Sequence, residues 1–218
     1  MDVDTTYTKE TMNSLKKFLT TLFCLIIMCN SFSQTIKLPS PVKTGGKPLM
    51  EALNDRKSSK GNYVNADLDL QTMSNLLWAA YGFNRPGKRT VPSAGNSQEF
   101  SVYVLLNRGA YLYDAQKNTL AGVRKGNFKE LLANHIQPYV NDVPVHLVYV
   151  GNLDKSMFGR DGILMDVGFI SQNVYLYAAS TGLGTVARAS FDRDKLSKIL
   201  NLNSRQVIVL VQAVGYIK

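Results

Sequence analysis

Apolar residues recur at helical spacing in two early stretches of the chain. In LDLQTMSNLLWAAYG they fall at every third or fourth position, which predicts a helix over residues 70–81 that Asp69 can cap and Gly82 can end. In PLMEALNDR a shorter apolar stripe follows Pro48, a residue suited to the first turn of a helix. The pattern therefore predicts a short helix followed by a longer one.

Strand-forming residues dominate the later stretches. Branched and aromatic residues fill EFSVYVLL (99–106), VPVHLVYVG (143–151) and QVIVLVQAVGY (206–216), so each predicts a strand, and the last two are apolar enough to be buried. GAYLYDAQKNTLAGV is typical of a short hairpin whose turn lies near Lys117 and Asn118.

A long helix is expected in the last third of the chain. In DGILMDVGFISQNVYLYAASTGLG apolar residues lie on nearly every face, as in a core helix, an interface helix or a membrane span. Asp166, Gln172 and Asn173 in its middle argue against the membrane. Shorter helices are predicted over 128–136 and, capped by Asp192, over 193–200. This mixture, without internal repeats, indicates an α+β fold with one sheet covered by helices.

The first 33 residues differ from this pattern. Lys16 and Lys17 precede FLTTLFCLIIMC, an apolar stretch too short to span a membrane, and small polar residues follow up to Gln34. We therefore predict a signal peptide over residues 1–33, with Met12 as a possible true start. An extended, proline-rich arm over 34–47 and one domain over 48–218 follow. An uncleaved anchor or a buried helix is the alternative for the first segment.

Both cysteines, Cys24 and Cys29, lie within that apolar stretch. A chain that begins at Gln34 has no thiol, which excludes disulfides, cysteine ligands and cysteine nucleophiles. We expect an exported protein in the periplasm of a Gram-negative bacterium. A lipid on Cys29, which would tether the protein to a membrane, is the alternative.

The composition adds a basic excess. The formal net charge is +9, and residues 1–33 contribute none of it, because their three lysines balance Asp2, Asp4 and Glu10. Such an excess favours an anionic partner. The basic residues are scattered and lack the aromatic-basic register of RNA-binding proteins, so a phosphate-bearing small ligand is favoured over nucleic acid.

The densest chemical motif is RKSSK, residues 56–60. Arg56, Lys57 and Lys60 supply cations and Ser58 supplies a neutral donor, which together can surround one phosphate. A solvated basic helix end would give the same pattern, since cations favour the C-terminal end of a helix. Taken alone, the motif leaves both interpretations open.

Three segments together resemble the flavin-dependent nitroreductase family. They are DRKSSK, PSAGNSQEF and DVGFISQNVYLYAASTGLGTV, and the resemblance covers residues 46–215. GGKPLMEAL ahead of the basic motif is similar to the short branch that includes azoline-forming peptide dehydrogenases. The resemblance implies a nitroreductase-like fold, with a central, mostly antiparallel sheet flanked by helices. It also implies an intertwined homodimer that binds FMN between its subunits.

The resemblance assigns two of these segments to the cofactor. The basic motif holds the FMN phosphate and ribityl chain in the family, which carries over to Arg56, Ser58 and Lys60 with Lys57 beside them; Lys60 stands where many relatives have arginine. The second segment comes from the other subunit in the family, so it would reach the partner's FMN. It comprises Pro92, Ser93, Ala94, Gly95 and Asn96, and an ordinary solvent turn is the alternative.

In the family the stretch after the long helix passes along the flavin ring. This carries over to Ala187, Arg188, Ala189 and Ser190, with backbone groups near Ala189 and Ser190 at the N5 edge. Relatives have proline, glutamate and glycine hereabouts, so backbone roles are expected rather than side-chain roles.

Other polar residues are expected to have structural roles. Gln172 and Asn173 can tie the long helix to the sheet. His135 and His146 lack partners at metal-ligand spacing, so we expect core or surface histidines and no metal. Lys218 is expected to fray rather than close over the phosphate.

The sequence shows no side-chain nucleophile, which suits chemistry that a flavin performs. The resemblance implies an oxidoreductase that passes hydride from NAD(P)H or another reduced donor through flavin N5 to nitroaromatics, quinones or similar flat acceptors. Free NAD(P)H is scarce outside the cytoplasm. Two alternatives therefore stay open: an exported FMN-dependent dehydrogenase or oxidase of peptides or small metabolites, and a flavin-binding protein without turnover.

Overall fold

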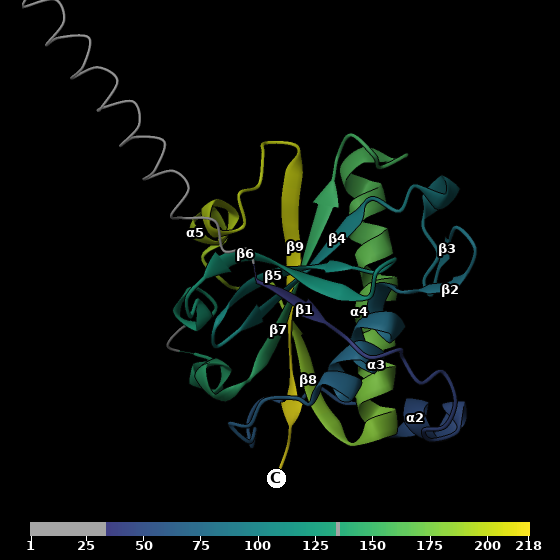
Figure 1. Ribbon diagram of the computed structural model, residues 1–218, viewed down its shortest axis with the longest axis vertical. Coiled ribbons are helices and arrows are strands. Elements are labelled where there is room, and N and C mark those ends of the chain that lie inside the picture. The colour runs from purple at the N-terminus through teal and green to yellow at the C-terminus, as the bar shows by residue number, and fades with distance from the viewer. Residues whose placement is uncertain (1–33, 134–135) are drawn as a thin grey trace, which may run out of the picture. The chain divides into compact units, whose positions relative to one another are not determined.

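A computed structural model describes residues 34–133 and 136–218 (Figure 1). The predictions for residues 1–33, Cys29 included, and for His135 lie outside these residues. The strands are β1 (Thr35–Lys37), β2 (Phe83–Arg85), β3 (Lys88–Arg89), β4 (Phe100–Leu106), β5 (Gly109–Asp114), β6 (Thr119–Lys125), β7 (Val145–Asn152), β8 (Leu183–Arg188) and β9 (Gln206–Tyr216). The helices are α2 (Leu49–Asp55), α3 (Leu70–Tyr81), α4 (Gly159–Thr181) and α5 (Arg193–Ile199), with 3-10 turns η1 (Ala94–Asn96), η2 (Lys129–Leu131) and η3 (Pro138–Asp142).

One seven-stranded sheet organises the fold, in the order β1-β6-β5-β4-β7-β9-β8, and each neighbouring pair is antiparallel. β2 and β3 form a separate hairpin. The predicted α+β class, with a largely antiparallel sheet flanked by helices, is confirmed.

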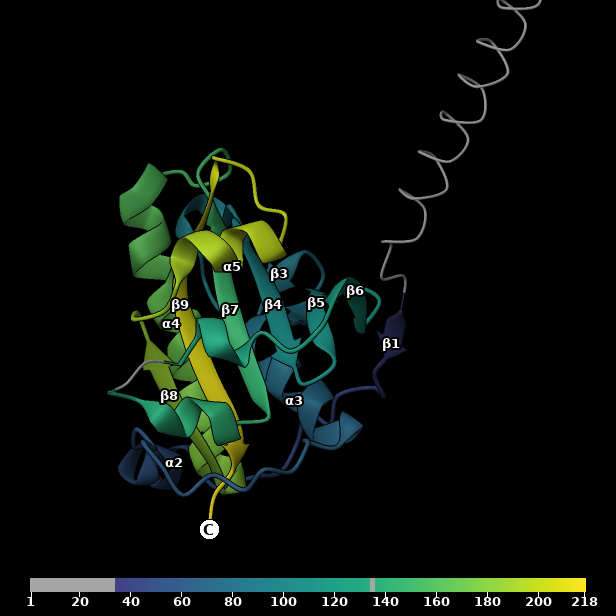
Figure 2. The same ribbon diagram turned by 90° about the vertical axis from the view of Figure 1, so that its left-hand side faces the viewer.

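The two faces of the sheet carry different layers (Figure 2). α4 packs on the face where Gln212 of β9 donates from Nε2 to the Ser171 carbonyl at 3.3 Å. Gly151 of β7 lies on the same face of the sheet. A Cβ at this position would lie 2.6 Å from Ile163 of α4, so a side chain there would push the helix away. α3 in turn packs against α4, and α2 lies against the C-terminal half of α4.

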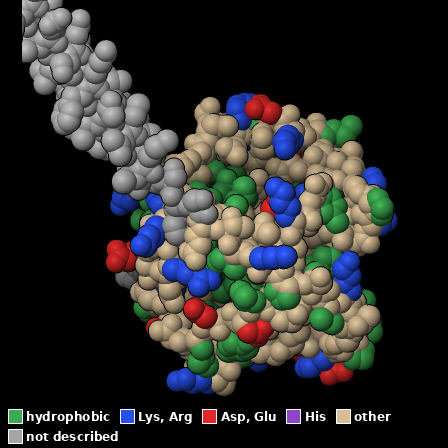
Figure 3. Space-filling model, in the orientation of Figure 1, with side chains coloured by type: hydrophobic (Ala, Val, Ile, Leu, Met, Phe, Trp, Pro, Cys, Tyr) green, Lys and Arg blue, Asp and Glu red, His purple; other side chains and the backbone are tan. Residues whose placement is uncertain are grey.

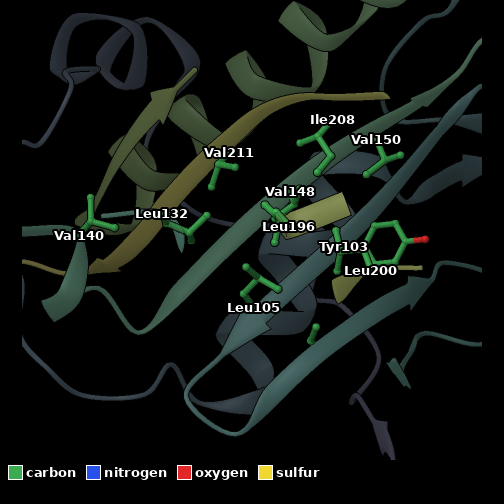
Figure 4. Close-up of a cluster of buried hydrophobic side chains, with 11 residues drawn as sticks. Tyr103, Leu105, Leu132, Val140, Val148, Val150, Leu196, Leu200, Ile208 and Val211 are labelled. Atoms are coloured by element: carbon green, nitrogen blue, oxygen red, sulfur yellow. The ribbon is translucent and has the colours of Figure 1, made fainter. Parts of the chain in front are cut away.

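The opposite face holds the core cluster shown in Figure 4. Leu196 and Leu200, from α5 and its end, meet Val148 of β7 and Val211 of β9, and all four side chains are almost fully buried. Alternate residues of β7 therefore face opposite layers, as strand geometry requires. The sheet is buried on both faces in its middle.

The predicted helix caps are confirmed. The Asp69 carboxylate accepts from the Thr72 backbone N–H at 2.9 Å at the start of α3, and the Asp192 carboxylate accepts from the Lys195 N–H at 3.1 Å at the start of α5. Asn118 has a φ of 51° in the β5–β6 turn, where the hairpin turn was predicted.

The helix predicted over 128–136 is wrong for the described residues, where a 3-10 turn is found instead. The Leu132 carbonyl accepts a 2.7 Å hydrogen bond from the Arg188 guanidinium of β8. This side chain occupies the position that a backbone N–H would take in a helix. The predicted arm contains a short strand, β1, which pairs with β6. β8 was not predicted as a strand at all, yet it pairs with β9 along its length.

None of the helices within the described ranges is both long enough and apolar enough to cross a membrane.

Candidate cofactor site

The basic motif lies where α2 ends and the chain turns onto β8. Arg56 caps α2, with its N–H bonded to the Ala52 carbonyl at 3.0 Å, and the Ser59 N–H then bonds to the Thr185 carbonyl of β8 at 2.9 Å. A Cβ at Gly184 would overlap Ile217 and press on Ser59. Glycine on β8 therefore lets the motif lie directly on the sheet.

A pocket of about 440 Å³ opens beside this motif. Its lining residues come from α2, the motif, α4, β8 and the end of the chain: Lys47, Asn54, Asp55, Arg56, Lys57, Ser59, Tyr175, Ala178, Ala179, Gly182, Leu183 and Ile217. Of the four predicted phosphate ligands, Arg56 and Lys57 line the pocket. Ser58 adjoins it through Tyr175, while the Lys60 side chain is exposed and outside the lining.

Tyr175 of α4 connects the basic motif to β8. Its hydroxyl lies 3.0 Å from the Ser58 hydroxyl and accepts the Ala187 N–H at 2.9 Å, and the Arg56 guanidinium lies 5.3 Å from its ring centre. Because Tyr175 accepts from Ala187, it can donate its own hydrogen to Ser58. The Ser58 hydrogen is then available to an anion in the pocket.

The one carboxylate in the pocket lining is already paired. Lys47 Nζ lies 2.5 Å from Asp55, and this contact raises the pKa of Lys47 and lowers that of Asp55. Arg56 and Lys57 form no ion pair with any described residue. The pocket thus presents unneutralised positive charge, which suits a phosphate.

The predicted second segment forms a fixed loop around η1. The Ser93 hydroxyl accepts the Gln98 N–H at 3.0 Å, and Gly95 and Asn96 have φ of 58° and 59°. The positive φ at Gly95 favours glycine, whereas the Met157 sulfur, 2.8 Å from where a Cβ would be, belongs to an exposed side chain that can move aside. Pro92, Gly95 and Asn96 are nevertheless exposed, as a segment that binds something outside its own chain would be.

Asp166 attaches this loop to the middle of α4. Its carboxylate accepts the Ala94 N–H at 3.0 Å, so it organises the loop rather than its own helix. Beside it lies Glu99, which is only 2% exposed and accepts no side-chain hydrogen bond within the described residues. The pKa of Glu99 is raised to about 7, mainly by burial. The backbone N–H of Glu99 lowers this pKa, and the neighbouring Asp166 carboxyl raises it.

The loop and the basic motif stand at different levels of α4. Asp166 holds the loop and Tyr175 holds the motif; they are nine residues apart on one helix, a rise of about 13 Å. No residue of the loop lines the pocket beside Arg56. Within one chain, the two predicted halves of the cofactor site are therefore not brought together.

The third segment divides between two environments. Ala187 is bonded to Tyr175, whereas Ala189 lies on a separate pocket of about 560 Å³ between α4, α5 and β9. Ala189 and Ser190 are exposed just past β8. The Arg188 side chain instead points to the face of the sheet that is opposite α4. There its guanidinium donates to the Gln137 side-chain oxygen at 2.6 Å, the Leu132 carbonyl at 2.7 Å and the Ser190 carbonyl at 3.1 Å.

The remaining polar residues have clear places. Asn173 donates to the Ala79 carbonyl of α3 at 2.9 Å, so it has a structural role but ties α4 to a helix and not to the sheet as expected. Gln172 is exposed on α4, so the structural role predicted for it is wrong. His146 is fully buried, and burial lowers its pKa to about 3. The Lys218 N–H bonds to the Asn62 carbonyl at 2.9 Å, so the prediction that Lys218 frays is wrong for its backbone. No cluster of three potential metal-binding side chains occurs among residues 34–133 and 136–218.

Sequence reasoning missed Tyr175 and the Glu99–Asp166 pair. Tyr175 lies in an apolar helix with several aromatic residues, and spacing alone does not single it out. Glu99 gave a better signal, because a carboxylate that begins an apolar strand must either be solvated or buried with a partner.

Comparisons with known proteins concern the sequence and the fold. The sequence model of the Nitroreductase family matches residues 53–216, a range that includes all three segments. A protein of Methanocaldococcus jannaschii, provisionally named a nitroreductase, is 29% identical over 176 residues, or 74% of this chain and 88% of its own.

Solved structures show the same fold. A crystal structure of a provisionally named nitroreductase from Ralstonia eutropha JMP134 is 33% identical, covers 86% of this chain and 92% of its own, and has a TM-score of 0.75. In the Escherichia coli microcin synthetase McbBCD complex, one chain is 20% identical, with 84% of this chain and 79% of its own covered and a TM-score of 0.64. The second likeness concerns the fold alone.

Proposed function

Since this chain belongs to the nitroreductase family and is an oxidoreductase of that type, we propose that it binds FMN and passes hydride from a reduced donor, NAD(P)H in the family, to a nitroaromatic, quinone or similar flat acceptor. The observation that carries the proposal is the unneutralised positive pocket formed by Arg56, Lys57 and the Ser58–Tyr175 pair.

The residues of this pocket fit FMN. The Arg56 and Lys57 side chains and the Ser58 hydroxyl offer charge-assisted and neutral donors to the phosphate. Gly182, which lines the pocket, has a φ of 75°, and nothing lies within 4 Å of where its Cβ would be, so the space beside it is open. When bound, FMN supplies a ring that accepts and releases hydride at N5, and the chain needs no nucleophile of its own.

A second copy of the chain would complete the site. Leu164, Met165 and Phe169 form an apolar stripe on α4, each about half exposed, and Gly168 between them leaves room for a close approach. A stripe of this kind is typical of a face that a symmetric dimer buries. We propose that α4 packs against α4 of the partner, so that the loop over 92–96 of one chain lies over the FMN held by Arg56 of the other.

In this arrangement, the chain's groups position the flavin and exclude water. Backbone groups at Ala189 and Ser190 would meet the N5 edge, and Arg188 holds that segment through the Ser190 carbonyl. The rigid loop around η1 would close the other side of the ring.

The experiment compares FMN with riboflavin, which lacks the phosphate. Purified protein should be yellow or become yellow with FMN. Arg56→Ala plus Lys57→Ala should weaken FMN binding by about 1.5 to 3 kcal/mol for each charge-assisted hydrogen bond to the phosphate that is removed, and riboflavin binding far less. If both flavins lose affinity equally, the phosphate assignment is wrong.

Turnover separates the proposal from its two alternatives. Anaerobic NADPH should bleach the bound flavin, and a nitroaromatic or quinone should restore its colour. Bleaching by peptide or metabolite substrates but not by NADPH would favour the dehydrogenase or oxidase. No bleaching with any donor would favour a binding protein.

We also propose that the chain is exported, on the basis of the apolar stretch before Gln34. Mass spectrometry of protein from the native host should find a mature terminus near Gln34, or a lipid on Cys29. An intact Met1 or Met12 terminus would contradict export.

A further inference from the structure

The β2–β3 hairpin places two cations directly opposite each other. Arg85 and Lys88 are register partners on either side of the Pro86–Gly87 turn, where Gly87 has the positive φ of 66° that this turn requires. Like charges at directly opposed positions destabilise a hairpin. Neither side chain forms an ion pair with a described residue.

This hairpin is fastened to the loop around η1. Gln98 donates from Nε2 to the Gly87 carbonyl at 2.7 Å and accepts from Arg89 Nε at 3.0 Å. The Arg89 guanidinium also stacks 3.9 Å from the Phe83 ring centre and 4.3 Å from that of Tyr81. Arg89 therefore makes contacts within its own chain, whereas the Arg85 and Lys88 side chains are exposed.

A hollow of about 580 Å³ lies between the hairpin and the loop. It is lined by Asn84, Arg85, Lys88, Arg89, Thr90, Val91, Pro92, Ser93, Gly95 and Asn96, and this lining contains no acidic residue. Figure 3 shows Lys and Arg side chains on the flank where Figure 1 places the hairpin. The hollow therefore has the charge and the donors to hold an anionic group.

We propose that this hollow is a subsite for the anionic group of a substrate that reacts at the flavin, with Arg85 and Lys88 as its charged ligands. The inference rests on the proposed function, because the loop over 92–96 would bring the hollow beside the partner's FMN. The phosphate of FMN itself belongs to the pocket at Arg56, whose lining shares no residue with this hollow. The chemistry recognised is a phosphate or carboxylate on the donor or the acceptor.

Pairs of substrates that differ in charge test this subsite. The acceptor pair is 4-nitrobenzoate and 4-nitrobenzyl alcohol, and the donor pair is NADPH and 1-benzyl-1,4-dihydronicotinamide. The variant is Arg85→Ala plus Lys88→Ala. The matched control is Arg124→Ala plus Lys125→Ala, an exposed Arg–Lys pair on β6 that changes the net charge equally.

The expected result is a fall of about tenfold or more in the ratio of kcat/KM between the charged and the neutral member of one pair, because only the charged member forms a charge-assisted hydrogen bond with Arg85 or Lys88. The control should change that ratio less than about twofold, since only long-range steering is altered. A fall in the acceptor pair assigns a carboxylate to the subsite, and a fall in the donor pair assigns a phosphate. Equal loss for both members of both pairs, or a matching effect of the control, overturns the proposal.

Two further measurements keep the subsite separate from the function on which it rests. FMN affinity is compared first, and a loss in the Arg85–Lys88 variant would place the pair in the FMN site and overturn the subsite. If the wild-type protein shows no turnover, the proposed function fails by itself.

Pyrophosphate is then titrated calorimetrically into an Arg56→Ala chain, with and without the hairpin substitutions Arg85→Ala and Lys88→Ala. Heat of binding that the hairpin substitutions abolish supports the subsite, and unchanged or absent heat overturns it.

Discussion

Replacing Glu99 by glutamine should change the pH dependence of stability in a defined direction. Glu99 is buried beside Asp166, and burial raises its pKa to about 7 from an ordinary value of 4.5. The folded state therefore holds a proton on this carboxyl that the unfolded state releases near pH 4.5. The stabilising contribution of that proton is complete below pH 4.5 and is lost as the pH rises towards and beyond 7.

The magnitude follows from the size of the shift. A difference of about 2.5 pH units corresponds to about 3 kcal/mol, since each unit is worth about 1.4 kcal/mol. Glutamine has nearly the same shape and no proton to lose, and its amide can donate to the Asp166 carboxylate. Glu99→Gln should therefore gain about 3 kcal/mol over the wild type between pH 4.5 and pH 8.

Urea unfolding at pH 5, 6, 7 and 8 measures this gain. The single tryptophan, Trp78, reports unfolding, and the protein is kept free of flavin so that ligand binding does not shift the midpoint. Glu130→Gln, at an exposed position on η2, is the matched control and should track the wild type. A constant difference in the free energy of unfolding between Glu99→Gln and the wild type across this pH range would show that the buried carboxyl is not protonated in the folded state.

Three other substitutions test the site and its supports. Tyr175→Phe leaves the Ala187 N–H without its partner and should weaken FMN binding by about 1 kcal/mol, or roughly fivefold in Kd by flavin fluorescence titration. Leu164→Asp plus Phe169→Asp places two charges on the apolar stripe of α4. Light scattering should then find a monomer, and this monomer should have lost FMN. A dimer that still binds FMN would exclude this face as the interface. Arg188→Met removes the buried hydrogen bonds to Leu132 and Gln137 and should lower the free energy of unfolding in urea by about 2 to 4 kcal/mol. Because the substitution also releases the Ser190 carbonyl, FMN affinity should fall as well, and an unchanged free energy of unfolding would contradict the structural role of Arg188.

Sequence patterns located the elements whose signals are local. α3 begins and ends at the predicted residues, because Asp69 caps the first turn and Gly82 follows the last. The β5–β6 hairpin was found for a similar reason, since Asn118 accepts the positive φ of the turn. Caps and turns depend on a few neighbouring residues, and these are visible in the sequence.

Elements defined by distant contacts were not predictable in the same way. β8 is short and contains Gly184, and only its ladder with β9 makes it a strand. The segment after Phe128 has a helical pattern, yet Arg188 takes the Leu132 carbonyl away from it. Both outcomes depend on residues far away in the chain, which periodicity does not connect.

The candidate site shows the same division. The basic motif and the loop were found because their residue types carry chemistry at close spacing. Tyr175, which joins Ser58 to Ala187, and Asp166, which holds Ala94, were found only in the fold. The prediction that two chains share each site arose from the resemblance and stays a prediction; the structure shows only that one chain keeps the two segments apart along α4.

Complementation between two defective chains tests this shared site most directly. One chain carries Arg56→Ala plus Lys57→Ala and the other carries Asn96→Ala, and each should be nearly inactive as a homodimer. In a differently tagged, co-expressed heterodimer, one site collects both lesions and the other collects neither. A shared site predicts one FMN per heterodimer and activity at half of the wild-type sites. Heterodimers that bind no FMN and recover no activity would show that both segments serve the site of their own chain, which would contradict the account.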